Sequence, residues 1–295
     1  MCVKMKKIIA FVSVMVLVCS IHAFAADSRF KVTFINPGPE DVNAPSGPFW
    51  NSVAQFMKAA AEDLNIDLEV IYSARNHILM QNQAYEVCKR KNPPDYLVVV
   101  NEKKAADKIV RAADKAGIKV FVMMNVFSGR QKAEMKSPRE KYKKWIGTLI
   151  PDNQFAGYQI AKLTIDRALE ANVAHDGKLH IVGITGDAST QASVERVAGL
   201  KQSVKEYPNV ILKQIFYGEW KKDVAESKTA IALKRYPHTT VIWAANDPMA
   251  LGAMKAVKAL GKQPGKDVFL GGLNWDGPGL EKVEDGSMVT SIGGH

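Results

Sequence analysis

The feature that most constrains the fold of this chain is an alternation of short apolar runs with longer amphipathic stretches. The short runs are bounded by Asn, Pro or Gly, which is typical of buried β-strands. The longer stretches place their apolar residues at helical spacing. Continuous apolar strands separated by helices predict βαβ units, and therefore a parallel sheet covered by helices on both faces. The predicted fold class is α/β.

The alternation occurs in both halves of the chain, and each half predicts four strands with helices between them. In the first half the predicted strands cover residues 30–35, 67–72, 95–100 and 119–124, and the helices cover 49–64, 81–91 and 105–116. In the second half the strands cover 179–184, 211–217, 241–245 and 268–273, and the helices cover 191–206, 224–236 and 249–260.

These halves predict two doubly wound parallel-sheet lobes joined by hinge strands. We expect the N-terminal lobe over residues 26–149 and the C-terminal lobe over 150–289, with residues 290–295 crossing back towards the first lobe. The predicted strands that cross between the lobes are 145–149 and 288–292. Residues 129–144 are polar and basic without an apolar period, which predicts a solvated hairpin or loop.

The first 25 residues have the three regions of a secretory signal peptide. Lys4, Lys6 and Lys7 form a positive start, residues 8–21 are almost entirely apolar, and small residues flank the expected cleavage point after Ala25. The apolar run is too short to span a membrane, which argues against an anchor. We therefore expect a signal peptide at 1–25 and a protein exported to the periplasm.

Two alternatives for this N-terminus carry less weight. A buried N-terminal helix does not explain why all three regions agree, and a lipoprotein modified at Cys19 is disfavoured because Val18 stands where a small residue is expected.

Cleavage lowers the net charge from +10 to +7 and leaves Cys88 without a disulfide partner in the chain. Export argues against a nucleic acid as partner, and a composition of 47% hydrophobic and 24% charged residues excludes a disordered chain.

Polar and aromatic side chains follow the predicted strands, at the edge where an open parallel sheet binds its ligand. Asn, Asp and Arg make paired hydrogen bonds with vicinal hydroxyls, and an aromatic plane packs against the C–H face of a sugar ring. This combination indicates a sugar or polyol as ligand. The residues are Asn36, the Phe49-Trp50 pair after a Gly/Pro-rich loop, Asn101, Glu102, Asn125, Asp187, Asn246, Asp247, Asn274, Trp275 and Asp276.

Each candidate also has a purely structural explanation. Phe49 and Trp50 begin a predicted helix, so both are equally compatible with the core of the first lobe. Arg196 lies early in a helix, where a surface ion pair with Glu195 or Asp187 is the alternative to ligand binding. The sequence leaves these alternatives open.

The same holds for the amide and carboxylate candidates. Asn36 and Asn125 are compatible with turn residues. Asp247 precedes a proline and is expected to be a helix N-cap, which makes Asn246 the better ligand candidate. Asp276 precedes a Gly-Pro pair, where an Asx turn is the alternative.

Signatures of enzymes are absent from the sequence. It contains no G-x-S-x-G elbow, no G-x-x-x-x-G-K-[ST] loop and no H-E-x-x-H pair. His175 and His180 are a poor pair of metal ligands, and Cys88 lies within a predicted helix with no His nearby in sequence. We therefore expect no enzyme, no cofactor and no metal site.

Four motifs in the same order carry a resemblance to a known family. Across residues 30–295 the chain resembles the type I periplasmic solute-binding proteins, the group that includes ribose- and galactose-binding proteins. It is more distantly similar to the periplasmic autoinducer-2 receptors. The motifs are N-D-P-M-A-L-G-A at 246–253, G-T-L-I-P-D-N-Q-F-A-G at 147–157, Glu195-Arg196 through Gly199, and G-G-L-N-W-D-G at 271–277.

The resemblance implies a monomeric binding protein whose two lobes close on a small-molecule ligand and are then recognised by a membrane permease or sensor protein. It also implies that the last first-lobe elements are missing from a sequence that stops at 295. The ligand-binding residues that it implies are the stacking aromatics Phe49 and Trp50, Asn125, the second-lobe arginine Arg196, the motif asparagine Asn246, and the aromatic–acid pair Trp275 and Asp276.

Two departures from the sugar-binding pattern bear on the ligand. An Asp-Arg pair of the sugar binders reads Asn125-Val126 here, so one charged clamp is missing. The loop at 37–48 is longer and rich in proline, and both features disfavour a plain aldopentose. The second crossover strand has no arginine of the kind with which autoinducer-2 receptors clamp a borate diester, which argues against that ligand.

The function expected first is delivery of a sugar or sugar-like polar ligand to an ABC-type transporter. A receptor that signals through a membrane sensor kinase would use the same crevice and is the alternative. A sugar-responsive repressor needs a helix-turn-helix before the first strand, where the signal peptide is expected. An enzyme ranks last because nothing assembles a nucleophile, a base and an orienting group.

Overall fold

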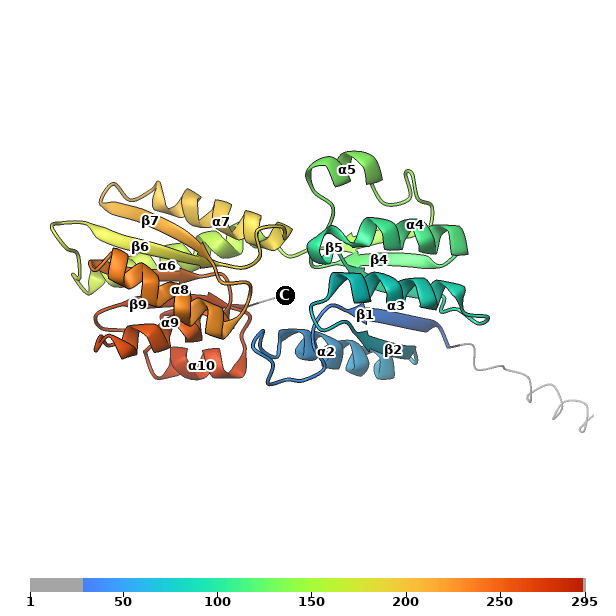
Figure 1. Cartoon of the computed structure of the whole chain (residues 1–295), viewed down its shortest axis with the longest axis horizontal. Helices are drawn as coiled ribbons and strands as arrows, with labels where there is room; N and C mark the ends of the chain where they lie inside the picture. Colours follow the sequence, from blue (N-terminus) through green and yellow to red (C-terminus); the bar gives the residue numbers. More distant parts are fainter. Residues whose placement is uncertain (1–28, 294–295) are drawn as a thin grey trace, which may run out of the picture.

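Two five-stranded parallel sheets organise the chain in a computed structural model that describes residues 29–293. Figure 1 shows the two lobes side by side, the first in blue to green and the second in yellow to red. The strand order is β2-β1-β3-β4-β5 in the first sheet and β10-β9-β8-β6-β7 in the second. The predicted α/β class with two parallel-sheet lobes is thus confirmed, while the predicted signal peptide lies outside the described residues.

The elements alternate strictly between strand and helix in the first lobe. They are β1 (Lys31–Asn36), α2 (Phe49–Asp63), β2 (Asp67–Tyr72), α3 (His77–Lys89), β3 (Tyr96–Val100), the 3₁₀ turn η2 (Glu102–Lys104), α4 (Ala106–Ala116), β4 (Lys119–Met123), α5 (Gly129–Met135) and β5 (Trp145–Leu149).

The second lobe begins with a helix and then repeats the alternation. Its elements are α6 (Asn153–Glu170), β6 (Leu179–Thr185), α7 (Gln191–Val204), β7 (Val210–Tyr217), α8 (Lys222–Arg235), β8 (Thr239–Ala244), α9 (Asp247–Ala259), β9 (Phe269–Leu273), α10 (Gly277–Glu284) and β10 (Thr290–Ile292). Within the described residues, no helix has the length and apolar character that a membrane span requires.

The apolar strands build a core on both faces of each sheet. Phe34 and Ile35 are neighbours on β1, and they pack on opposite sides of the first sheet. Ile35 joins the cluster beneath α3 and α4, whereas Phe34 packs with Trp50 of α2. In the second lobe Trp243 of β8 is fully buried, and its Nε1 donates to the carbonyl oxygen of Gly157 at 2.9 Å.

The structure differs from the sequence prediction at four helices. Helix α3 begins at His77 rather than at 81, because the Asn76 side chain accepts from two backbone N–H groups of the first turn. Helices α6 and α10 were not predicted, although Ile160, Ala161, Ile165 and Ala168 recur at helical spacing on the buried face of α6. The prediction of a loop at 129–144 is wrong for 129–135, which form α5.

The two strands predicted to cross between lobes each pair within one sheet. β5 pairs with β4, and β10 pairs with β9, so each lies at the edge of its own lobe. The chain enters the second lobe directly after β5, through residues 150–152. β5 therefore leads from the edge of the first sheet into the second lobe, whereas β10 forms the edge of the second sheet, and no crossing between the lobes is seen for it within the described residues.

Helices α6 and α7 approach each other closely enough to require glycine. A Cβ atom on Gly157 would lie 2.1 Å from the carbonyl oxygen of Arg196, and one on Gly199 would lie 2.0 Å from the carbonyl oxygen of Gln154. No other residue fits such a contact without separating the helices. This backbone-to-backbone packing brings the N-terminus of α6 next to Arg196.

Candidate functional site

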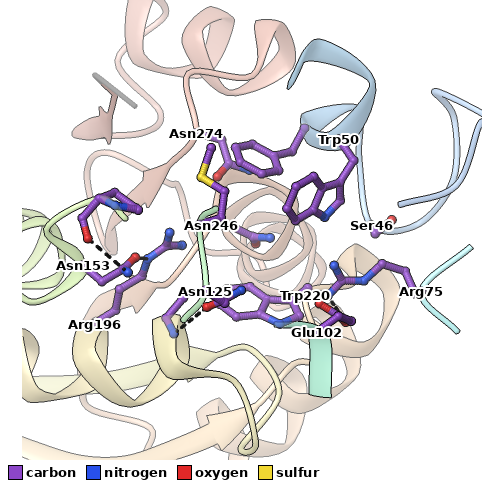
Figure 2. Close-up of a pocket in the computed structure, with 14 residues that line it drawn as sticks. Ser46, Trp50, Arg75, Glu102, Asn125, Asn153, Arg196, Trp220, Asn246 and Asn274 are labelled. Atoms are coloured by element: carbon purple, nitrogen blue, oxygen red, sulfur yellow. Dashed lines mark hydrogen bonds and ion pairs between the residues drawn. The ribbon is translucent and has the colours of Figure 1, made fainter. Parts of the chain in front are cut away.

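The carboxyl ends of strands from both sheets surround a cleft between the lobes. Figure 2 shows side chains from both lobes converging on it. Five of the seven residues predicted to bind ligand line this cleft, namely Phe49, Trp50, Asn125, Arg196 and Asn246. The other lining residues are Ser46, Arg75, Glu102, Met124, Pro151, Asn153, Ala192, Trp220 and Asn274.

Aromatic side chains line the cleft from both lobes. Trp50 begins α2, is only 7% exposed and contacts Phe49 edge to face, with ring centroids 5.0 Å apart. It belongs to the first-lobe core, as one interpretation expected, and it also lines the cleft, so its stacking on a ligand stays a prediction. Trp220 follows β7 in the second lobe and lies against Gly186, where a Cβ atom would be 2.0 Å from the indole ring. Asn36 holds the backbone of Trp50 in place, because its Nδ2 donates to the Trp50 carbonyl oxygen at 2.9 Å.

Arg196 is the charged side chain that the second lobe contributes. Its Nε donates to Oδ1 of Asn153 at 3.0 Å, and its Nη1 donates to the carbonyl oxygen of Ala245 at 2.7 Å. Its guanidinium carbon lies 5.6 Å from the ring centre of Trp220. Burial lowers the pKa of Arg196 to about 10, which still leaves it charged at neutral pH. The guanidinium therefore lies in the cleft, and the surface ion pair with Glu195 or Asp187 does not form.

A second charged group lies in the cleft on the first-lobe side. Nη2 of Arg75 and Oε1 of Glu102 are 3.2 Å apart, and the Glu102 side chain is only 1% exposed. Burial raises the pKa of Glu102, against the opposing effect of the Arg75 charge. Among the described residues, Oε1 of Glu102 accepts no hydrogen bond. The charged pair that the Asn125-Val126 position lacks is thus present elsewhere, on the loops after β2 and β3.

Besides Asn153, three asparagines add amide groups to the cleft. Oδ1 of Asn125 accepts from the backbone N–H of Ala192 in the other lobe at 3.1 Å. Oδ1 of Asn246 accepts from the N–H of Met249 at 2.9 Å, so Asn246 is the N-cap of α9. The expectation that Asp247 caps this helix is therefore wrong. Asn274 donates from Nδ2 to Oδ2 of Asp276 at 3.2 Å.

Trp275 and Asp276 do not belong to the set of lining residues. Trp275 is 60% exposed, and its Nε1 donates to the carbonyl oxygen of Ser291 on β10 at 2.7 Å. Asp276 is buried next to the lining residue Asn274, and this burial raises the pKa of its carboxyl. A ligand contact from either residue stays a prediction.

Backbone strain is concentrated in the loops that form the cleft. Residues other than glycine have positive φ in the loop after β2 (Arg75, 61°), after β4 (Met124, 62°), after β7 (Trp220, 62°) and after β9 (Asn274, 136°). All four line the cleft. Such conformations cost free energy and gather at functional sites, which supports the assignment of this cleft.

The lobes also contact each other directly across the cleft. Nζ of Lys103 lies 3.6 Å from Oδ2 of Asp187, and the N–H of Lys222 donates to the carbonyl oxygen of Pro45 at 3.1 Å. Together with the bond between Ala192 and Asn125, these contacts close the cleft. Pro45 belongs to the proline-rich loop at 37–48, so this loop reaches from the first lobe to the start of α8.

Asp247 has a role in the second lobe that its sequence position does not suggest. The hydroxyl of Ser291 on β10 donates to its carboxylate, with the shorter distance 2.7 Å, and the N–H of Asp276 donates to Oδ2 at 3.0 Å. Burial raises the pKa of Asp247 to about 7. This carboxylate thus joins the start of α9 to β10 and to the loop after β9.

Replacing Asp247 by asparagine is expected to flatten the pH dependence of stability. Because its pKa in the folded state lies above its ordinary value of 3.8, the folded state binds the proton more tightly. That stability is fully present below about pH 4 and is lost as the pH rises to about 7, by up to about 1.4 kcal/mol per pH unit. Urea unfolding of both proteins between about pH 5 and 8 measures the effect. Parallel curves for the two proteins would contradict it.

Metal binding and cysteine chemistry receive no support from the described part of the chain. Residues 29–293 contain no group of three or more His, Cys, Asp or Glu side chains that could hold a metal ion. Burial raises the pKa of the Cys88 thiol, which disfavours the reactive thiolate. The cleft therefore offers groups for recognition, namely amides, a guanidinium, a carboxylate and aromatic planes.

Comparison with known proteins finds the same architecture. The family model described as periplasmic binding protein domain matches residues 42–294. The ribose import binding protein RbsB of Escherichia coli (strain K12) is 24% identical over 289 residues, covering 98% of this chain and 86% of that protein. A crystal structure of a periplasmic sugar-binding protein from Pseudomonas fluorescens has a TM-score of 0.77 and 34% sequence identity, covering 90% of this chain and 75% of that chain.

One further relative matches over a shorter stretch. The xylitol-binding protein of Mycolicibacterium smegmatis (strain ATCC 700084 / mc(2)155) is 28% identical over 144 residues, which cover 48% of this chain and 38% of that protein. The match thus spans less than half the length of that relative.

Proposed function

Because this chain belongs to the periplasmic binding protein domain family, we propose that it captures a sugar or sugar-like polar ligand between its lobes and delivers it to an ABC-type transporter. The observation that carries the proposal is the cleft, where aromatic planes and an arginine meet amide groups from both lobes. Vicinal hydroxyls match the amides and charged groups, and the C–H face of a sugar ring matches the aromatic planes. The ligands named for relatives, ribose and xylitol, have the same chemistry.

The proposed contacts extend the set expected from the sequence. Trp50 and Trp220 would pack on the ligand from opposite lobes, and Arg196 would donate to its oxygens. Glu102 would accept from a ligand hydroxyl at Oε1, because this buried oxygen accepts no hydrogen bond among the described residues, although Nη2 of Arg75 lies 3.2 Å from it. We further propose export by the segment at 1–25 and action as a monomer.

A thermal-shift screen tests the proposal. The panel contains pentoses, hexoses, polyols, nucleosides, amino acids and autoinducer-2. A ligand at a thousandfold excess over its Kd stabilises the folded protein by about 4 kcal/mol, which raises the melting temperature by about 10 °C. We expect a shift with a sugar or polyol, and a shift of about 3 °C or less with Arg196→Gln at the same ligand concentration, because a hundredfold weaker affinity leaves about a tenfold excess over Kd. A cooperative melt that no sugar or polyol shifts would contradict the proposed ligand class, and a shift with autoinducer-2 alone would favour a sensing receptor.

A further inference from the structure

Half of the positive net charge of the chain lies in one segment of 16 residues. The basic segment, residues 129–144, contains seven cationic and two acidic side chains, for a net charge of +5 out of +10. The cations are Arg130, Lys132, Lys136, Arg139, Lys141, Lys143 and Lys144.

The fold anchors the basic segment firmly and displays it on the outside of the first lobe. Met135 within it and the flanking Phe127 and Trp145 are buried in the first-lobe core. The N–H of Lys144 donates to Oδ1 of Asp114 on α4 at 2.8 Å. Figure 1 shows α5 standing beyond α4 and β5, outside the layers of the lobe. The basic segment is therefore an ordered part of the fold, and it presents its charges on the outside of the first lobe.

Three of the cations are available to an outside partner. Of the other four, Arg130 pairs with Glu134 at 2.7 Å, Lys141 and Lys143 donate to backbone carbonyl oxygens of the same segment, and Lys144 is half-buried. Lys132, Lys136 and Arg139 are exposed, and none of them forms an ion pair within residues 29–293. Their charges are exposed to solvent without a counter-charge from the protein.

The side chains around these cations indicate what kind of partner fits. Protein interfaces are anchored by exposed aromatic or large apolar side chains. In the basic segment Met135 is buried, and Tyr142 is half-buried with the Arg111 guanidinium 5.3 Å from its ring centre. The large hydrophobic residues that are exposed in the described chain all lie outside 129–144. A surface that offers cations without an anchor suits an anionic lipid bilayer, which attracts lysines and arginines by charge alone.

We propose that the basic segment binds the surface of an anionic phospholipid bilayer. Lys132, Lys136 and Arg139 lie against the lipid phosphates, and the seven-residue helix α5 stays outside the hydrocarbon. Binding of this kind is reversible and screened by salt. The proposed function is delivery of a ligand to a membrane transporter. Binding to the bilayer would let the protein reach that transporter by diffusing along the membrane instead of through the whole compartment.

Sedimentation with lipid vesicles tests the proposal, using protein recovered from the periplasm of expressing cells. At low salt we expect binding to vesicles that contain phosphatidylglycerol and none to phosphatidylcholine alone, with loss of binding at about 0.5 M salt. The triple variant Lys132→Gln, Lys136→Gln, Arg139→Gln is expected to bind about a hundredfold more weakly, from about fivefold per cation. Its thermal shift with a sugar ligand should be unchanged, which separates this proposal from the one for the cleft.

The matched control removes three exposed lysines elsewhere, as Lys58→Gln, Lys201→Gln, Lys234→Gln. It is expected to retain the binding of the unsubstituted protein. Equal losses in both triple variants would assign binding to net charge rather than to the basic segment, and would overturn the proposal. Absence of vesicle binding together with retention on immobilised poly-L-glutamate would assign the segment to an acidic protein partner instead.

Discussion

Replacing Arg196 by glutamine is expected to weaken ligand binding by a factor of at least about 100. Two of the five guanidinium N–H groups are used by Asn153 and the Ala245 carbonyl, which leaves the others for the cleft. Each hydrogen bond to a charged group contributes about 1.5–3 kcal/mol, so the loss of two such bonds to ligand accounts for this factor. Titration calorimetry with the sugar that gives the largest thermal shift measures the change.

Arg167→Gln is the matched control for this variant. It makes the same charge change on an exposed surface of α6, where Arg167 pairs only weakly with Glu170 at 3.4 Å. We expect its affinity for the sugar to equal that of the unsubstituted protein. If Arg196→Gln folds with a normal melting temperature and binds the sugar with full affinity, the ligand does not contact Arg196, and the assignment of the second-lobe contact is wrong.

Replacing Gly157 by alanine is expected to lower the free energy of unfolding by about 3 kcal/mol. The new Cβ atom would overlap the Arg196 carbonyl oxygen at 2.1 Å, a backbone atom that moves only if α6 and α7 separate. Overpacking of a closely packed interface costs about 1–3 kcal/mol, and backbone overlap places this site at the upper end. Because the displaced carbonyl belongs to Arg196, ligand affinity should fall as well. Urea unfolding and calorimetry measure the two effects.

Gly277→Ala provides the comparison for the same chemical change. A Cβ atom at Gly277 meets nothing within 4 Å, and its φ is not positive. This substitution at the start of α10 is therefore expected to leave both stability and affinity unchanged. Equal melting temperatures for the Gly157 and Gly277 variants would mean that the two helices do not pack as closely as described.

The parallel sheets were predictable from the sequence because their strands have a strong sequence signal. β3 and β8 are short, apolar and rich in β-branched residues, with breaks on both sides. Helix α6 was not predicted, although Ile160, Ile165 and Ala168 on its buried face follow a helical period. Gly157 and Thr164 are buried on the same face, and neither adds to the apolar signal. A helix that is held by close backbone contact has a weak sequence signal, although its packing is among the tightest in the protein.

The candidate site was predictable in part, for a different physical reason. The rule that ligands lie at the carboxyl ends of parallel strands selects Asn125 and Asn246. Applied to β2 and β7 as well, the same rule would have selected Arg75 and Trp220. The contact between Arg75 and Glu102 has no sequence signal, because β1 lies between β2 and β3 in the sheet.

The direction of the side chains at the start of a helix was a second feature of the site that the sequence did not predict. Whether Asn246 or Asp247 caps α9 depends on backbone angles that the residue types leave open, and the extended φ and ψ of Asn246 decide it. Asp247 is therefore free to face the interior and hold β10.

The contacts that close the cleft have a consequence for the speed of release. Breaking the bond between Asn125 and Ala192, the Lys103–Asp187 pair and the bond from Lys222 to Pro45 must precede escape of an enclosed molecule. The residence time of the cargo is then set by how often the lobes part, as well as by its own contacts. Cargoes whose own contacts break faster than the lobes part would leave at similar rates whatever their affinity, and a transporter that pulls on the loop at 37–48 would shorten every one of those residence times.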